Sequence, residues 1–212
     1  MGFRFYERRF MEIVTLPKAN LTPNFIGSWA ISPLSICDEL IDYFELNKNS
    51  QNKGVTTNGE DLDFKNSVDI RILPNEIKLP GNEVFEKYFH NLFSCYEEYV
   101  MQWPFLGNFA QKLEVGGFNL QRYQSGQHFQ SLHTERTSLD TLHRVFAWMT
   151  YLNDVDQEDG GSTSFSHYDL AIQPRKGLTL IWPAEWTHAH RGNILKANSK
   201  YIITGWMIFP NN

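Results

Sequence analysis

The sequence has few cysteines, no excess of basic residues and no long apolar run. Cys37 and Cys95 are the two cysteines among 212 residues, and neither lies in a CxxC motif or in a histidine-rich context. A disulfide framework or a zinc knuckle is therefore not expected, and a cytoplasmic location is the simplest interpretation. Charges interrupt the N-terminal MGFRFYERRFMEIV before an apolar stretch develops, so no export signal is expected. No membrane partner is predicted either.

The charge balance and the aromatic content narrow the function classes. The formal net charge is -5, whereas general electrostatic binding to nucleic acid needs clustered Lys and Arg side chains that neutralise the phosphates. No nucleic-acid partner is therefore predicted. Aromatic residues make up 15% of the chain, and such residues favour strands and the walls of concave sites. This composition favours a β-rich fold with a deep pocket.

The part of the chain before residue 117 contains the predicted helices. MEIVTL, FIGSWAI and SVDIRIL read as short strands, and residues 35–45 as a helix with Ser35 as its cap. Residues 47–63 are polar and rich in Asn and Gly, which predicts a mobile surface loop and a candidate lid. A longer helix is predicted over residues 82–103, with one apolar stripe formed by Val84, Tyr88, Leu92, Cys95 and Tyr99.

From residue 117 onward the pattern changes to short strands separated by turns. The predicted strands are FNLQRYQ, HFQSLHTE, RVFAWMTYLN, TSF, LAIQ, LTLIW, THAH and YIITGWMIF. Eight short strands predict a double-stranded β-helix, or jelly roll. The expected fold class is α+β, with helices packed on one face. One domain is expected over residues 1–212, with helical support and a lid in 1–116 and the jelly-roll core in 117–212.

Two distant segments could supply a metal site. Residues two apart in a strand point to the same face, so His133 and Glu135 in LHTER can present an imidazole and a carboxylate to one point. A histidine from THAHRG on a facing strand would complete the two-histidine, one-carboxylate set that is usual in non-haem Fe(II) oxygenases. His188 and His190 share a face by parity, so parity alone does not choose between them.

Further motifs surround these residues in a consistent order. They are Tyr123-x-x-Gly126 ten residues before His133, Arg144 with YLND, GGSTSF at 160–165, HRG at 190–192, Lys200 and Trp206. Over residues 123–206 the sequence thereby resembles the prolyl 4-hydroxylase-like 2-oxoglutarate and Fe(II)-dependent dioxygenases. The resemblance implies a reaction in which O2 oxidises a substrate C–H bond while 2-oxoglutarate is converted to succinate and CO2. Fe(II), 2-oxoglutarate and O2 are the expected cofactors, with ascorbate as a possible addition.

The resemblance also implies roles for individual residues. Lys200 stands ten residues after His190, the spacing expected of the second metal histidine, which favours His133, Glu135 and His190 as ligands and leaves His188 in a supporting role. Lys200 would meet the C5 carboxylate of 2-oxoglutarate, and Tyr123 could add a hydroxyl. Thr163 and Trp206 are expected as pocket walls, with core packing as an equal interpretation.

Some alternatives remain open at this level. The family usually has Asp where this chain has Glu135, so a non-catalytic binding module on the same fold is one alternative. A zinc or manganese site in a cupin-like barrel is another, although the position of Lys200 argues against it. The expected substrate is proline in a peptide or protein. A free amino acid or another small molecule is the alternative substrate.

Overall fold

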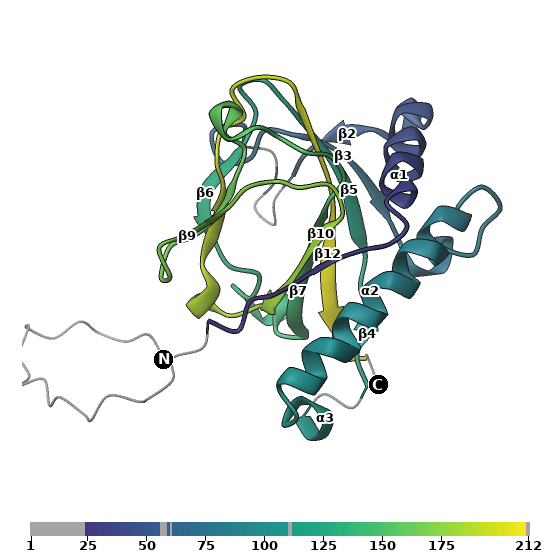
Figure 1. Cartoon of the computed structure of the whole chain (residues 1–212), viewed down its shortest axis with the longest axis vertical. Coiled ribbons are helices and arrows are strands. Elements are labelled where there is room, and N and C mark those ends of the chain that lie inside the picture. Colours follow the sequence, from purple (N-terminus) through teal and green to yellow (C-terminus); the bar gives the residue numbers. More distant parts are fainter. Residues whose placement is uncertain (1–23, 56–58, 60, 110–111, 211–212) are drawn as a thin grey trace, which may run out of the picture.

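The computed structural model describes residues 24–55, 59, 61–109 and 112–210. The predicted strand at MEIVTL lies outside these residues. Within them, the strands form two antiparallel sheets, one large and one small (Figure 1). The large sheet has the order β1 (Gly27–Ala30), β10 (Leu178–Pro183), β7 (Arg144–Tyr151), β12 (Ser199–Ile208), β5 (Phe118–Gln124), β3 (Val68–Ile72) and β2 (Asn52–Lys53), and β4 (Glu114–Val115) also pairs with β12.

The small sheet has four strands in the order β6 (Phe129–His133), β11 (His190–Gly192), β8 (Thr163–Phe165) and β9 (Leu170–Ile172). The predicted jelly roll is thus confirmed. Strands β1, β2 and β3 precede residue 117 and yet belong to the large sheet. The first part of the chain therefore supplies strands as well as helices, and the proposed division at residue 117 remains a prediction.

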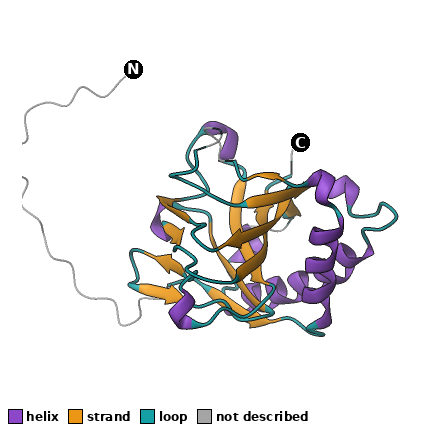
Figure 2. Cartoon of the chain, turned by 90° about the horizontal axis from the view of Figure 1, so that it is seen from above, coloured by secondary structure: helices purple, strands orange, loops and turns teal. Residues whose placement is uncertain are grey.

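The helices cover the outer face of the large sheet (Figure 2). They are α1 (Ser35–Leu46), α2 (Glu83–Gln102) and the short α3 (Leu106–Phe109). The predicted stripe of α2 is buried in full, and Phe85 and Phe89 widen it. Burying side chains of this size stabilises the fold by about 2 kcal/mol each.

Ser35 is the first residue of α1, while Leu34 takes the cap position, so the predicted serine cap is wrong. No helix in the described ranges is apolar enough over a sufficient length to cross a membrane.

Strand β7 separates two apolar cores. Phe146 and Trp148 face the helices, whereas Ala147, Met149 and Tyr151 face the space between the two sheets. Because side chains alternate along a strand and both faces of β7 are covered, every residue from Val145 to Tyr151 is buried.

The segment predicted as a lid is partly ordered by the sheet edge. It begins with a 3-10 turn at Lys48–Ser50 and continues into β2, which pairs with β3. The Gly54 N–H then donates to the carbonyl of Ser67. The predicted surface loop is therefore wrong at Asn52–Lys53, which form a strand. Residues 56–58 and 60 of the predicted lid lie outside the described residues, and a lid role remains a prediction.

Candidate metal and cosubstrate site

The two histidines of the predicted site lie on paired strands of the small sheet. His190 on β11 is the direct partner of His133 at the end of β6, and their ring centroids are 4.4 Å apart. Nδ1 of His133 lies 2.8 Å from the Ser131 carbonyl, and Nδ1 of His190 lies 2.9 Å from the His188 carbonyl. A carbonyl can only accept a hydrogen bond, so Nδ1 carries the proton in each ring. Each Nε2 is then left with a lone pair that can bind a metal.

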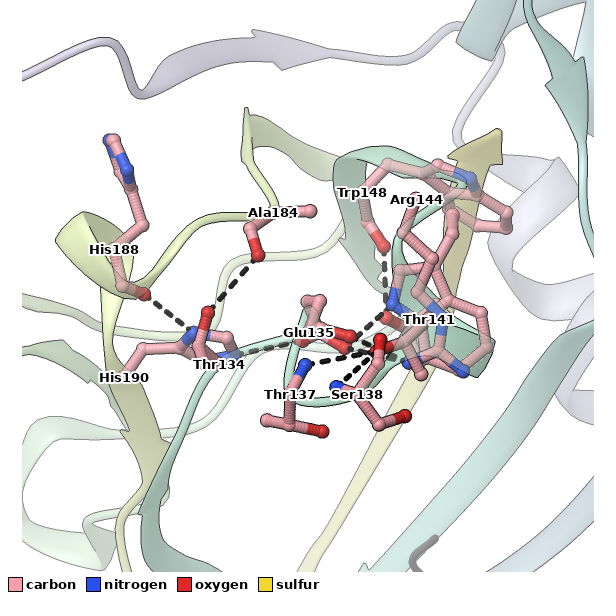
Figure 3. A network of polar contacts seen from close by, with 12 residues as sticks. Thr134, Glu135, Thr137, Ser138, Thr141, Arg144, Trp148, Ala184, His188 and His190 are labelled. Atoms are coloured by element: carbon pink, nitrogen blue, oxygen red, sulfur yellow. Dashed lines mark hydrogen bonds and ion pairs between the residues drawn. The ribbon is translucent and has the colours of Figure 1, made fainter. Parts of the chain in front are cut away.

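Glu135 completes the cluster from a bend beyond the strand. β6 ends at His133, so the predicted strand extends two residues too far at this end, and strand alternation does not position Glu135. Its Oε1 lies 3.5 Å from Nε2 of His190 (Figure 3). One ligand atom from each of His133, Glu135 and His190 lies within 4.8 Å of the others. A single divalent ion could contact all three.

The Glu135 carboxylate is oriented by Trp206 and Arg144. The Trp206 indole donates from Nε1 to Oε2 of Glu135 at 2.6 Å. The Arg144 guanidinium donates to the Glu135 backbone carbonyl at 3.0 Å, lies 3.9 Å from Oε2 and stacks 3.7 Å from the Trp206 ring. Oε1 therefore remains directed toward the two imidazoles. Trp206, predicted as a pocket wall, contacts the carboxylate directly.

Burial keeps both imidazoles in the neutral form that a metal requires. Burial first, and the neighbouring His133 second, lower the pKa of His190 to about 4. The pKa of His133 is also lowered, chiefly by burial. Near pH 7 the cluster therefore consists of two neutral nitrogen donors and one carboxylate oxygen donor. This donor set fits a divalent iron and leaves room for further ligands.

His188 does not join this cluster. The predicted strand THAH is wrong: Trp186–His188 forms a 3-10 turn, and the strand begins at His190. The His188 ring points away from Glu135 (Figure 3), and its Nε2 lies 2.8 Å from the Asn24 carbonyl. Its backbone carbonyl orients His190 instead. The prediction that His188 and His190 share one strand face is wrong, because the turn at Trp186–His188 breaks the alternation.

Lys200 is a buried cation without an acidic partner among the described residues. The residue is 3% exposed. Its Nζ donates to the Gly161 carbonyl at 2.8 Å and lies 4.5 Å from the centroid of the Tyr123 ring. Burial lowers the pKa of Lys200 to about 8. An unpaired buried ammonium group is costly, and an anionic ligand would offset that cost.

Thr163 and Tyr151 lie on β8 and β7, two strands that flank the space between the sheets. Gly161, which contacts Lys200, precedes β8, and on that strand Phe165 pairs with His190, so Lys200 and the histidine cluster lie beside the same strand. The buried Thr163 accepts a 2.7 Å hydrogen bond from the Tyr151 hydroxyl. The Tyr123 hydroxyl donates instead to Oε1 of Gln121 at 2.7 Å, so in this structure Tyr123 presents its ring face to Lys200.

Sequence reasoning missed a buried polar network that Gln121 connects to Tyr123. Asp69 accepts hydrogen bonds from Lys65 at 2.6 Å, from Ser67 at 2.8 Å and from Gln121 at 3.1 Å. These residues lie on or just before neighbouring strands of the large sheet and point into the barrel. The one signal in the sequence was the presence of Asp69 and Gln121 within otherwise apolar strand patterns. The sequence also contained no signal for the buried hydrogen bond between Tyr151 and Thr163.

Comparison with known proteins agrees with this geometry. Residues 118–208 match the family model described as the 2OG-Fe(II) oxygenase superfamily, and this segment contains the three clustered residues and Lys200. The oxygenase is accordingly a 2-oxoglutarate-dependent dioxygenase that uses Fe(II) and O2. A comparison with curated protein sequences finds no match.

Solved structures share the oxygenase fold at low sequence identity. The 2OG complex of the viral collagen prolyl hydroxylase from Paramecium Bursaria Chlorella virus-1 is 17% identical, with a TM-score of 0.62, over 86% of this chain and 95% of that one. A Pseudomonas putida prolyl-4-hydroxylase is 17% identical, with a TM-score of 0.67, over 88% and 93%. A Trichoplax adhaerens prolyl hydroxylase in complex with a hypoxia inducible factor peptide fragment is 16% identical, with a TM-score of 0.69, over 87% and 84%. These similarities concern the fold.

Proposed function

We propose that this oxygenase hydroxylates proline in a peptide or protein substrate, with Fe(II) bound by His133, Glu135 and His190. The 2-oxoglutarate carboxylate farthest from the metal would be bound by Lys200. The observation that carries the proposal is the combination of the three converging ligand atoms with an unpaired buried lysine on the neighbouring strands. Apolar side chains at these positions would stabilise the fold better, so both features indicate a functional role.

The chain's own residues have separate tasks in this reaction. Bound Fe(II) would supply the position at which O2 is activated while 2-oxoglutarate is oxidatively decarboxylated. His133 and His190 remain neutral donors because burial lowers the pKa of each. Trp206 holds one oxygen of Glu135, which limits the carboxylate to a single donor oxygen and leaves other metal positions for ligands. The Lys200 ammonium pairs with the distal carboxylate in a charge-assisted contact.

Tyr151 and Thr163 complete the proposed cosubstrate pocket. Both are buried and are joined by one hydrogen bond. A hydroxyl can donate to a carboxylate. Because Thr163 accepts the hydrogen bond from Tyr151, the Thr163 hydroxyl still has its own proton to donate. We assign that proton to the distal carboxylate of 2-oxoglutarate, beside Lys200.

The substrate class is supported by the structural neighbours. Each of the three neighbours is described as a prolyl hydroxylase, and one was solved with a peptide fragment. The exposed Trp186 in the turn before His190 offers an aromatic surface of the kind that extended proline-rich segments use. A free amino acid would need no such surface outside the pocket.

The proposal can be tested by incubating the full chain with Fe(II), ascorbate and 2-oxoglutarate. Proline-rich peptides, including a Pro-Pro-Gly repeat, would be offered beside free L-proline. We expect one added oxygen atom on a peptide proline by tandem mass spectrometry, together with peptide-stimulated succinate formation. His133→Ala is the matched control and should abolish both signals. Equal succinate from the wild type and this control would refute the enzyme assignment, and oxygenation of free proline alone would refute the peptide assignment.

A further inference from the structure

A bulge in β6 brings Phe129 and His133 together. His190 pairs with His133 and Gly192 pairs with Phe129, so three residues of β11 lie opposite five residues of β6. In a straight strand, side chains four residues apart are separated by about 13 Å. The Phe129 and His133 ring centroids are instead 3.8 Å apart, with an angle of 9° between the planes. The extra residues of β6 therefore fold the two rings into a parallel stack.

Two hydrogen bonds of the Ser131 backbone hold the bulge in place. The Ser131 carbonyl accepts the hydrogen bond from Nδ1 of His133 at 2.8 Å, and the Ser131 N–H points to the Phe64 carbonyl at 3.4 Å. Asn66 and His128 exchange a pair of backbone hydrogen bonds next to it. Bulges are known to redirect side chains near functional sites. Here the bulge orients the His133 ring.

Phe129 itself is supported from the segment before β3. The Phe64 ring lies 6.0 Å from the Phe129 ring, and Nζ of Lys65 lies 5.5 Å from its centroid. Lys65 is buried and fixed by its 2.6 Å ion pair with Asp69. The buried Lys65–Asp69 pair thus lies next to the ring that stacks on the proposed metal ligand.

We propose that Phe129 is a positioning residue for metal binding, because its stack fixes the plane of the His133 imidazole and thereby the direction of Nε2. This inference rests on the proposed function, in which His133 binds the metal. The hydrogen bond from Nδ1 to the Ser131 carbonyl fixes the tautomer of His133 but still permits small rotations of the imidazole about its Cβ–Cγ bond. The stacked Phe129 ring restricts these rotations before a metal binds. Partners that orient metal ligands contribute about 10-fold to 100-fold in metal affinity.

The test measures Co(II) binding by the full chain, using the visible absorption of Co(II) as a readout of affinity and coordination geometry. Phe129→Leu removes the flat face and should weaken Co(II) binding about 10-fold, with an altered spectrum. Phe129→Tyr keeps the face and should stay within about twofold of the wild type. Phe64→Leu is the matched control, since it removes a ring from the same cluster that does not stack on His133. It should lower the melting temperature without weakening Co(II) binding.

Wild-type affinity and spectrum in Phe129→Leu would overturn the inference, and so would an equal loss in Phe64→Leu. Phe129→Met fills the space with a flexible chain, and it provides the same comparison if Phe129→Leu does not fold. The proposed function is judged separately, by Co(II) binding to the wild type and its loss in His133→Ala. If the wild type binds no Co(II), both proposals fail. If it binds and the Phe129 variants bind equally well, the positioning role alone fails.

Discussion

The Trp206 indole and the Glu135 carboxylate are joined by a 2.6 Å hydrogen bond between Nε1 and Oε2. Trp206 lies on β12 of the large sheet, whereas Glu135 follows β6 of the small sheet. The bond therefore connects the two sheets at the proposed metal site. It leaves Oε1 as the oxygen that faces the histidines.

Replacing Trp206 with Phe should weaken metal binding about 10-fold, because the carboxylate loses the donor that orients it. Isothermal titration with Co(II) or Fe(II) measures the change. Trp148→Phe is the matched control: the Nε1 of Trp148 is buried without a hydrogen-bond partner among the described residues, so this variant should lose stability but keep its metal affinity. Equal affinities in the wild type and Trp206→Phe would contradict the orienting role.

Shortening Glu135 to Asp should reduce metal affinity in this chain. The side chain loses one methylene, so its carboxylate can no longer accept from Trp206 and reach the histidine pair at the same time. Glu135→Gln keeps the length and removes the charge, so comparison of the two variants separates reach from charge. Tighter metal binding by Glu135→Asp than by the wild type would mean that glutamate impairs the site.

The two buried lysines should respond in opposite ways to substitution by Met. Lys200 has no acidic partner among the described residues, so Lys200→Met should raise the melting temperature of the ligand-free protein. Lys65 is paired with Asp69, so Lys65→Met leaves a buried carboxylate unpaired and should destabilise the fold by about 3–5 kcal/mol. Thermal unfolding without ligands compares the variants.

Lys200→Met should also weaken 2-oxoglutarate binding about 100-fold, since loss of one partner of a buried charge pair costs about 2–5 kcal/mol. Calorimetric titration with 2-oxoglutarate and Mn(II) would measure this loss. Retention of wild-type affinity by Lys200→Met would show that another group binds the distal carboxylate.

The affinity for 2-oxoglutarate should fall as the pH rises above about 8. Burial lowers the pKa of Lys200 to about 8 in the ligand-free protein, so the neutral amine, which cannot pair with a carboxylate in the same way, becomes dominant above that pH. For stability the sign is reversed. The penalty for burying the charge is complete below the folded pKa and declines as the pH rises from about 8 toward the unfolded value near 10.4. Dissociation constants measured from pH 6.5 to 9.5 test the first statement. An identical pH profile in Lys200→Met would contradict it.

Much of the fold and the main site residues could be predicted from the sequence. The boundaries of β5 match FNLQRYQ residue for residue, and the stripe of α2 is buried as its spacing predicts. Strand alternation predicted His133 and Glu135 as partners, and the resemblance to the 2-oxoglutarate and Fe(II)-dependent dioxygenases predicted His190 and Lys200; the structure brings His133, Glu135 and His190 together. The predictions that failed concern local departures from regular geometry. THAH contains a turn, β6 ends before Glu135, and Asn52–Lys53 form a strand at the edge of the large sheet.

The sequence by itself determined the periodicity of the strands and helices and the identity of the ionisable groups, because side-chain alternation and residue chemistry are local properties. The tertiary structure alone decided which of these groups meet. The separation of His188 from His190, the hold of Trp206 on Glu135 and the stack of Phe129 on His133 all depend on turns, bulges and contacts between sheets. Such contacts join residues far apart in the chain or break its regular period, so a local pattern cannot contain them.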